Sequence, residues 1–272
     1  LSGTPQQSDR WKRAVDDANH AVGEAIGKRY VEKHFDAKTK ERADEMAKNI
    51  IAAFAKRIDA LAWMSPQTKA HAKAKVAGLT VGMGYPDTWR DYTGLEIRRD
   101  DPLGNAQRAE QFEYARNIAK LGKPVDHNEW AMLPQTINAM NVPLENRLVF
   151  PAAILQPPFF DGAADDAVNY GAIGAVIGHE ISHGFDNAGA LFDETGKLHN
   201  WWTAEDLTHF IASGVSLSSQ FSRHLPFPVA HLLGKLTLGE TFPYVAGLRP
   251  PPNASHKSVQ RQTVHTPRSI LH

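Results

Sequence analysis

Three residues that could carry out metal chemistry lie together in the sequence, at His179, Glu180 and His183. Residues four positions apart in an α-helix lie one turn above each other, so both imidazoles can reach one ion. Glu180 is offset from His179 by about 100°, too far to share the ion with the two imidazoles but close enough to reach a water on it. The pattern indicates zinc, which acidifies a bound water and polarises a carbonyl group, with Glu180 as the general base.

The alternative is that two of the thirteen histidines fall at this spacing by chance. The surrounding segment, from about Asp166 to Phe185, has no proline and carries apolar residues at helical spacing, so we expect one buried helix. A buried helix excludes histidine and glutamate unless they are paired or bound to metal. The context therefore favours the metal site.

The elements around this segment can be predicted from local signals. Ser65 followed by Pro66 should cap and open a helix through Lys75, and Thr203 should cap another, with a carboxylate three residues later. Apolar periodicity predicts further helices at Asp9–His34, Ala37–Trp63 and 105–121, and short β-rich runs predict strands at Thr80–Met83, Thr93–Ile97 and Arg147–Phe150, the last continuing through Ala152–Ile154. The expected fold class is mainly α with a small β component.

Composition limits the classes of function. The chain has 272 residues, of which 42% are apolar, and thirty basic and thirty acidic residues cancel, so nothing points to nucleic acid. No cysteine is present, which leaves His, Asp and Glu as metal ligands. No apolar run is long enough to span a membrane, and the opening Leu1–Pro5 has neither an initiator Met nor a signal-peptide core, so we expect a piece of a longer protein.

The charge distribution changes abruptly near residue 211. Residues 211–272 contain one acidic residue, Glu240, beside six Lys and Arg, and the last stretch is rich in proline. We expect residues 249–272 to form a poorly ordered tail. Local reading-frame shifts in the source gene would explain the altered composition.

Several longer blocks resemble the neprilysin-like zinc metalloendopeptidases, peptidase family M13. The chain resembles a bacterial-type member of that family and covers only part of it. The resemblance runs from about Arg10 to Gly247, and the blocks that carry it are Trp63–Thr68, Gly84–Asp87, Phe150–Phe160, Val168–Gly171, Gly178–Asp186 and Trp201–Thr203. It implies a thermolysin-like zincin catalytic unit at 133–248, incomplete here, and part of a helical domain at 1–132.

The resemblance also implies site residues beyond the motif. Two His from one helix and a Glu from a later one would bind one zinc ion per chain, and Glu240 occupies the family's Leu-Thr-Leu-Gly-Glu block. Glu205 is a rival third ligand, but its place in a capping turn explains it without a metal. Asn138 and Ala139 match the pair with which the family holds the substrate backbone on an edge strand.

This chain also departs from the family pattern. Tyr244 stands where the family has an Asp that orients a ligating His, and the segment from residue 241 onward lacks the residues that would anchor Glu240, so we expect that segment to be poorly held. Beyond Gly247 we expect no resemblance. His265 and Arg268 are poor substitutes for the family's later His and Arg, which stabilise the oxyanion and bind substrate.

Two functions from different classes follow. The first is a zinc endopeptidase that cuts short or unfolded peptides on the amino side of large apolar residues, in an extracytoplasmic location, as the resemblance implies. The second is a catalytically impaired or inactive fragment that only binds zinc or peptide. A helical scaffold without zinc is a third and weaker alternative, and the oligomeric state stays open.

Overall fold

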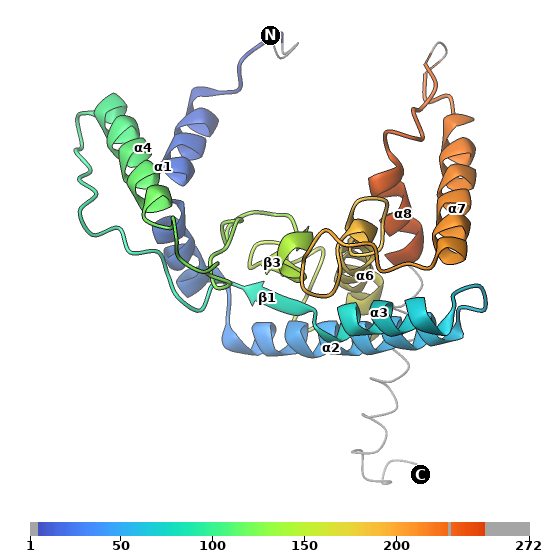
Figure 1. Ribbon diagram of the computed structural model, residues 1–272. Coiled ribbons are helices and arrows are strands. Elements are labelled where there is room, and N and C mark those ends of the chain that lie inside the picture. The colour runs from blue at the N-terminus through green and yellow to red at the C-terminus, as the bar shows by residue number, and fades with distance from the viewer. Residues whose placement is uncertain (1–4, 228–229, 248–272) are drawn as a thin grey trace, which may run out of the picture.

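The computed structural model describes residues 5–227 and 230–247, and this part of the chain is mainly helical with one small sheet (Figure 1). The predicted fold class is therefore confirmed. The helices are α1 (Arg10–His34), α2 (Ala37–Ala60), α3 (Pro66–Ala77), α4 (Pro102–Ile118), α5 (Asp166–Gly171), α6 (Ile173–His183), α7 (Ala204–Ser222) and α8 (Leu238–Gly247), and the strands are β1 (Thr80–Gly84), β2 (Met140–Val142) and β3 (Arg147–Pro151). Two short 3₁₀ turns, η1 (Pro143–Glu145) and η2 (Gly189–Leu191), complete the described elements.

Side-chain caps define where several helices begin. The Ser65 hydroxyl accepts a hydrogen bond from the Thr68 amide at the start of α3, with Pro66 in the first turn. Thr203 does the same for the Asp206 amide at the start of α7. Both predicted caps are confirmed. They occur because a short polar side chain satisfies an amide that has no partner inside the helix.

Helices α2, α5 and α8 pack against α6, which carries the two histidines. In Figure 1, α2 runs along the base of the molecule, α1 and α4 lie side by side at one end, and α7 and α8 lie at the other. Helix α6 packs between α2 and α8. Within the described residues, no helix is both long enough and apolar enough to cross a bilayer.

The sheet has the strand order β1-β3-β2. β3 is buried along its whole length and pairs parallel with β1 and antiparallel with β2. This order leaves β2 at the edge of the sheet.

One hydrophobic core joins elements from both halves of the chain. Met46 and Ile50 of α2 pack in one buried cluster with Phe150 of β3 and with Ile177 and Ile181 of α6. The core therefore extends across the predicted boundary between residues 132 and 133, and the division into two domains stays a prediction. The predicted tail at 249–272 lies outside the described residues.

The strand predicted at 93–97 and the predicted extension of β3 through 152–154 are wrong, because local hydrogen bonds form turns there. At 93–97 the Leu95 amide donates to the Tyr92 carbonyl, and Gly94 adopts a φ of 90°. At 152–154 the Ile154 amide donates to the Pro151 carbonyl, so the chain turns directly after β3.

The single helix predicted at 166–185 is also wrong, because it is divided into α5 and α6. The break lies at Ala172, which has φ −98° and ψ −93°. There the Ile173 amide donates to the Phe159 carbonyl, 2.9 Å away, instead of to a carbonyl of the preceding turn. A contact from a distant loop therefore sets where the motif helix begins.

Candidate metal centre

Helix α6 presents its histidines on the face opposite the core. Ile173, Ile177 and Ile181 recur every four residues and are at most 1% exposed. His179 follows Ile177 by two residues, which turns it about 200° around the helix axis. Burial of the isoleucines thus directs His179 and His183 away from α2 and towards α8.

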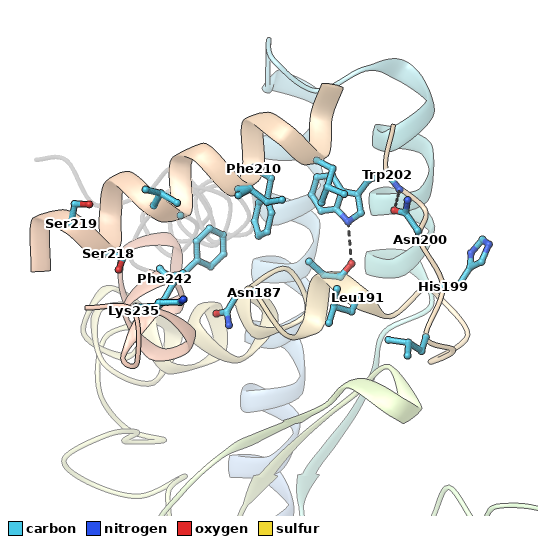
Figure 2. Close-up of a pocket in the computed structure, with 17 residues that line it drawn as sticks. Asn187, Leu191, His199, Asn200, Trp202, Phe210, Ser218, Ser219, Lys235 and Phe242 are labelled. Carbon is cyan, nitrogen blue, oxygen red and sulfur yellow. Dashed lines mark hydrogen bonds between the residues drawn. The ribbon is translucent and has the colours of Figure 1, made fainter. Parts of the chain in front are cut away.

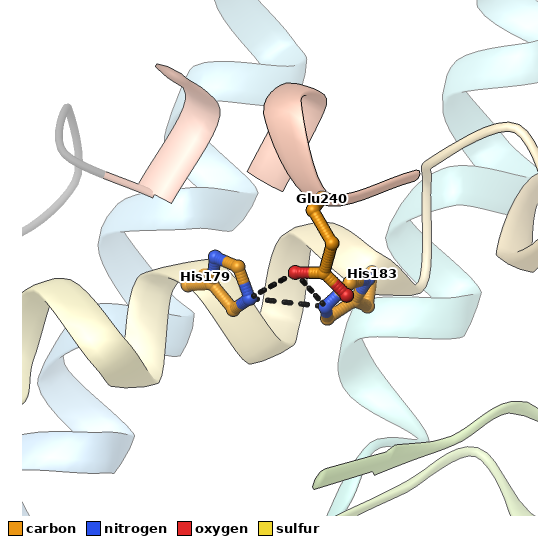
Figure 3. A group of neighbouring side chains, drawn as sticks. All are labelled: His179, His183 and Glu240. Carbon is orange, nitrogen blue, oxygen red and sulfur yellow. Dashed lines mark hydrogen bonds and ion pairs between the residues drawn. The ribbon is translucent and has the colours of Figure 1, made fainter. Parts of the chain in front are cut away.

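His179, His183 and Glu240 bring three donor atoms together (Figure 3). The Nε2 atoms of the two histidines lie 3.0 Å apart. The Glu240 Oε2 atom lies 3.4 Å from Nε2 of His179 and 3.8 Å from Nε2 of His183. In residues 5–227 and 230–247, this is the one group of three or more acidic or histidine side chains arranged closely enough to hold a metal ion.

The geometry and chemistry of this donor set fit zinc. In a tetrahedral site with bonds of about 2.0–2.1 Å, ligand atoms lie about 3.3 Å from each other. The three observed separations bracket that value. Two imidazoles and one carboxylate also form a known zinc ligand set that leaves a coordination position open. Glu205, the rival ligand, is exposed in the first turn of α7 and is not part of the group.

Two glycines allow α8 to approach α6 closely. A Cβ added at Gly178 would lie 2.4 Å from the Gly247 carbonyl oxygen, and one added at Gly247 would lie 2.4 Å from the His179 amide nitrogen. Thr241 and Pro243 of α8 are buried as well. The expectation that the segment after Glu240 is poorly held is therefore wrong for residues 241–247, because the glycine contact and these buried residues hold α8 against the motif helix.

The two histidines differ in what their second ring nitrogen contacts. Nδ1 of His183 lies 2.7 Å from Oδ2 of the buried Asp186. Burial alone would lower the pKa of His183, but the hydrogen bond to Asp186 and the charges of Glu180, Asp186 and Glu240 together outweigh it, and the pKa is raised. Sequence reasoning assigned no role to Asp186, although its position three residues after His183 was a signal that the two could meet.

His179 has no such partner. Its Nδ1 atom is buried and has no hydrogen-bond partner among the described residues. Tyr244 lies against it instead, with the two ring centroids 4.7 Å apart. Burial and the neighbouring His183 lower the pKa of His179. The departure from the family pattern at position 244 thus coincides with an unpaired nitrogen on the ring that it faces.

Glu180 is 6% exposed, and its burial raises its pKa to about 7. Its main-chain carbonyl accepts a hydrogen bond of 2.8 Å from the Asn141 side chain, which ties α6 to the edge strand β2. Asn138 and Ala139 come just before this strand, and Ala139 is buried whereas Asn138 is exposed. The predicted substrate-binding pair therefore directly precedes β2, an edge strand of the sheet.

A separate apolar pocket of about 840 Å³ lies between α7, α8 and the segment that follows α6 (Figure 2). Phe210 of α7 and Phe242 of α8 face it, and the Trp202 indole beside them donates to the Ala190 carbonyl. None of the three donor residues lines this pocket. It is therefore distinct from the candidate metal centre.

Comparison with known proteins identifies the family. Two sequence models, both described as peptidase family M13, match residues 1–86 and 138–266. The chain belongs to peptidase family M13. The second M13 match runs past Gly247, so the expectation that the resemblance ends there is wrong.

Curated relatives and a solved structure agree with membership of M13. The chain is 34% identical to an endothelin-converting enzyme homolog of Locusta migratoria and 38% identical to a neutral endopeptidase of Lactobacillus helveticus, over 92% and 91% of its length. The inhibitor complex of the zinc metalloprotease Zmp1 of Mycobacterium tuberculosis matches the whole chain with 45% identity and a TM-score of 0.87. The chain spans 35% and 38% of the two relatives and 41% of the Zmp1 chain.

Proposed function

We propose that this chain forms the zinc-binding core of an M13 metalloendopeptidase that hydrolyses peptide bonds in peptides. One observation carries the proposal: donor atoms from two helices, α6 and α8, converge with separations of 3.0 to 3.8 Å. Its relatives include a zinc metalloprotease and a neutral endopeptidase, which supports the same class of activity.

His179, His183 and Glu240 would hold one zinc ion per chain. When bound, zinc supplies Lewis-acid polarisation of a carbonyl and makes water more acidic. The protein's part is to orient both imidazoles. Asp186 does this for His183, because an Nδ1–H that donates to the carboxylate leaves Nε2 free as the ligand atom.

Glu180 is the proposed general base. As the water oxygen bonds to the peptide carbonyl carbon, the Glu180 carboxylate takes the water proton, and it passes that proton to the leaving nitrogen as the carbon–nitrogen bond breaks. Its buried position beside His179 excludes bulk water from this transfer. The hydrogen bond from the Asn141 side chain to the Glu180 main-chain carbonyl fixes the Glu180 backbone to the edge strand β2.

Substrate binding is proposed for the segment that contains Asn138 and Ala139. A peptide in extended conformation can add to the free side of β2, and the exposed Asn138 side chain can donate to its backbone. Asn138→Ala should raise KM more than it lowers kcat. An extracytoplasmic location is part of the same proposal, and secretion of an epitope-tagged full-length protein would test it.

The test combines zinc content with hydrolysis of a quenched peptide. We expect one zinc per chain, loss of any hydrolysis with chelator, and recovery when zinc is returned. Glu180→Gln should keep the zinc and abolish hydrolysis, because the amide cannot accept the proton. Glu205→Gln, at an exposed glutamate outside the group, is the matched control. A Glu180→Gln variant that kept most of the activity would rule out this base.

The second candidate function is a zinc-binding domain without turnover. The unpaired Nδ1 of His179 favours it, because one ligand lacks the partner that fixes its tautomer and ring orientation. Stoichiometric zinc without hydrolysis, in a preparation where a complete M13 enzyme cleaves the same peptide, would support this alternative. No bound zinc at all would exclude both functions.

A further inference from the structure

Lys75 is a lysine in the protein interior, on the face of α3 that packs towards the end of α6. Its residue exposure is 2%, and its Nζ atom donates to the carbonyls of Gly189 and Phe192, both at 2.7 Å. The Phe185 ring lies 5.6 Å from Nζ. The Lys75 carbonyl is held in turn by the Asn146 side chain at 2.8 Å. Hydrogen bonds therefore hold both the ammonium group and the main chain of Lys75.

The two carbonyls that Lys75 holds belong to the turn that positions Asp186. The amides of Ala188 and Gly189 both donate to Asp186 Oδ1 at 2.7 Å. The other oxygen, Oδ2, lies 2.7 Å from Nδ1 of His183. An unbroken series of short contacts thus runs from Lys75 through Gly189 and Asp186 to a proposed zinc ligand.

We propose that Lys75 is a positioning residue for the metal centre, which fixes the 186–192 turn so that Asp186 orients His183. This inference rests on the proposed function, in which His183 binds zinc. It also explains how the first part of the chain contributes to the site. Lys75 lies in the M13 match at 1–86, whereas the turn and the motif lie in the match at 138–266.

Burying the Lys75 ammonium is unfavourable because it removes a charge from water, so the buried position indicates that its hydrogen bonds offset this desolvation cost. Burial lowers the pKa of Lys75 to about 8, and the nearby carboxylates Asp186, Asp193 and Glu194 oppose that shift. The group is still mostly protonated at neutral pH, with three donors available. Methionine, which is of similar length, would fill the space but release both carbonyls.

The test compares Lys75→Met with Lys73→Met, a control on the same helix whose ammonium forms a surface pair with Asp59. In the zinc-free protein, deuterium exchange at the amides of Ala188 and Gly189 should rise about tenfold or more in Lys75→Met and stay unchanged in the control. Zinc affinity, measured by chelator competition, should fall about tenfold in Lys75→Met only.

A double variant separates positioning from general destabilisation. If Lys75 acts through Asp186, then Lys75→Met combined with Asp186→Asn should bind zinc no more weakly than Asp186→Asn alone. Additive losses, or unchanged exchange at Ala188 and Gly189, would overturn the inference. If Lys75→Met does not fold, Lys75→Gln is measured in the same way, and an exchange rate equal to wild type would overturn the inference as well.

The exchange measurement also keeps the two proposals apart. If the wild-type chain bound no zinc, the proposed function would fail, whereas exchange in the zinc-free protein would still report whether Lys75 holds the turn.

Discussion

Position 244 provides a direct test of how the metal centre is oriented. Tyr244 lies one helical turn after Glu240 on α8, and its ring centroid is 4.7 Å from that of His179. Replacing it with aspartate puts a carboxylate beside the buried Nδ1 atom of His179, which has no hydrogen-bond partner among the described residues. We expect Tyr244→Asp to increase zinc affinity, because the new carboxylate accepts a hydrogen bond from Nδ1–H and directs Nε2 to the metal.

The magnitude can be bounded in two ways. Leaving a buried polar group unpaired costs about 1–3 kcal/mol, and loss of a partner of a metal ligand weakens binding by about 10- to 100-fold, or about 1.4–2.7 kcal/mol. The Tyr244 residue is 64% exposed, so water will screen part of the new interaction. We therefore expect the lower end of this range, about a tenfold gain.

Chelator competition measures the gain, and two variants control for other causes. Tyr244→Asn has nearly the same shape as aspartate without its charge, and Tyr244→Ala only removes the ring. Both should gain clearly less than Tyr244→Asp, while turnover stays low in all three. The reasoning would be refuted if alanine improved zinc binding as much as aspartate, because steric relief would then be the cause.

Other perturbations test the packing of α8 on α6, the dependence of stability on pH, and the stabilisation of the fold by zinc. Gly178→Ala should weaken zinc binding about tenfold or more, because its Cβ meets the Gly247 carbonyl at 2.4 Å and pushes α8 away. Gly174→Ala should leave zinc binding unchanged, because its added Cβ would have no neighbouring atom closer than 3.4 Å. Equal zinc affinities of the two variants would contradict this packing. Burial would raise the pKa of Asp206, but hydrogen bonds led by those from Ser65 lower it from 3.8 to about 2. The ionised carboxylate therefore stabilises the folded protein above about pH 4, and this stabilisation is lost as the pH falls towards 2. Asp206→Asn should therefore lower the free energy of unfolding in urea by about 1–2 kcal/mol at pH 7 and by less at pH 3, whereas an equal loss at both pH values would exclude the charge as the cause. Zinc at about one hundred times its Kd should add about 2.7 kcal/mol of stability that chelator removes, and a melting temperature that responds to neither would contradict a metal site in the folded chain.

The features that could be predicted from the sequence are those set by neighbouring residues. The helix caps at Ser65 and Thr203 are local, because each hydroxyl reaches an amide three residues away. The placement of His179 and His183 on one helix face follows in the same way from their spacing of four residues. The mainly helical fold class rests on such local patterns.

Predictions failed where a distant contact competed with the local pattern. Apolar periodicity continues through Ala172, yet the carbonyl of Phe159 takes the Ile173 amide and the helix is interrupted. Nothing in a short window of sequence reports this partner. The extension of β3 through Ala152–Ile154 failed for a local reason instead, because the Ile154 amide donates to the Pro151 carbonyl and the chain turns.

The candidate site shows the same division. Residue types and a family resemblance proposed Glu240 as a ligand, but only the packing of Gly178 against Gly247 brings its carboxylate to within 3.4 Å of His179. The roles of Asp186 and Lys75 likewise depend on hydrogen bonds between segments far apart in the chain. Sequence thus determined which groups can bind a metal, whereas tertiary packing determined which of them meet, because donor atoms converge only when buried helices fix their backbones in three dimensions.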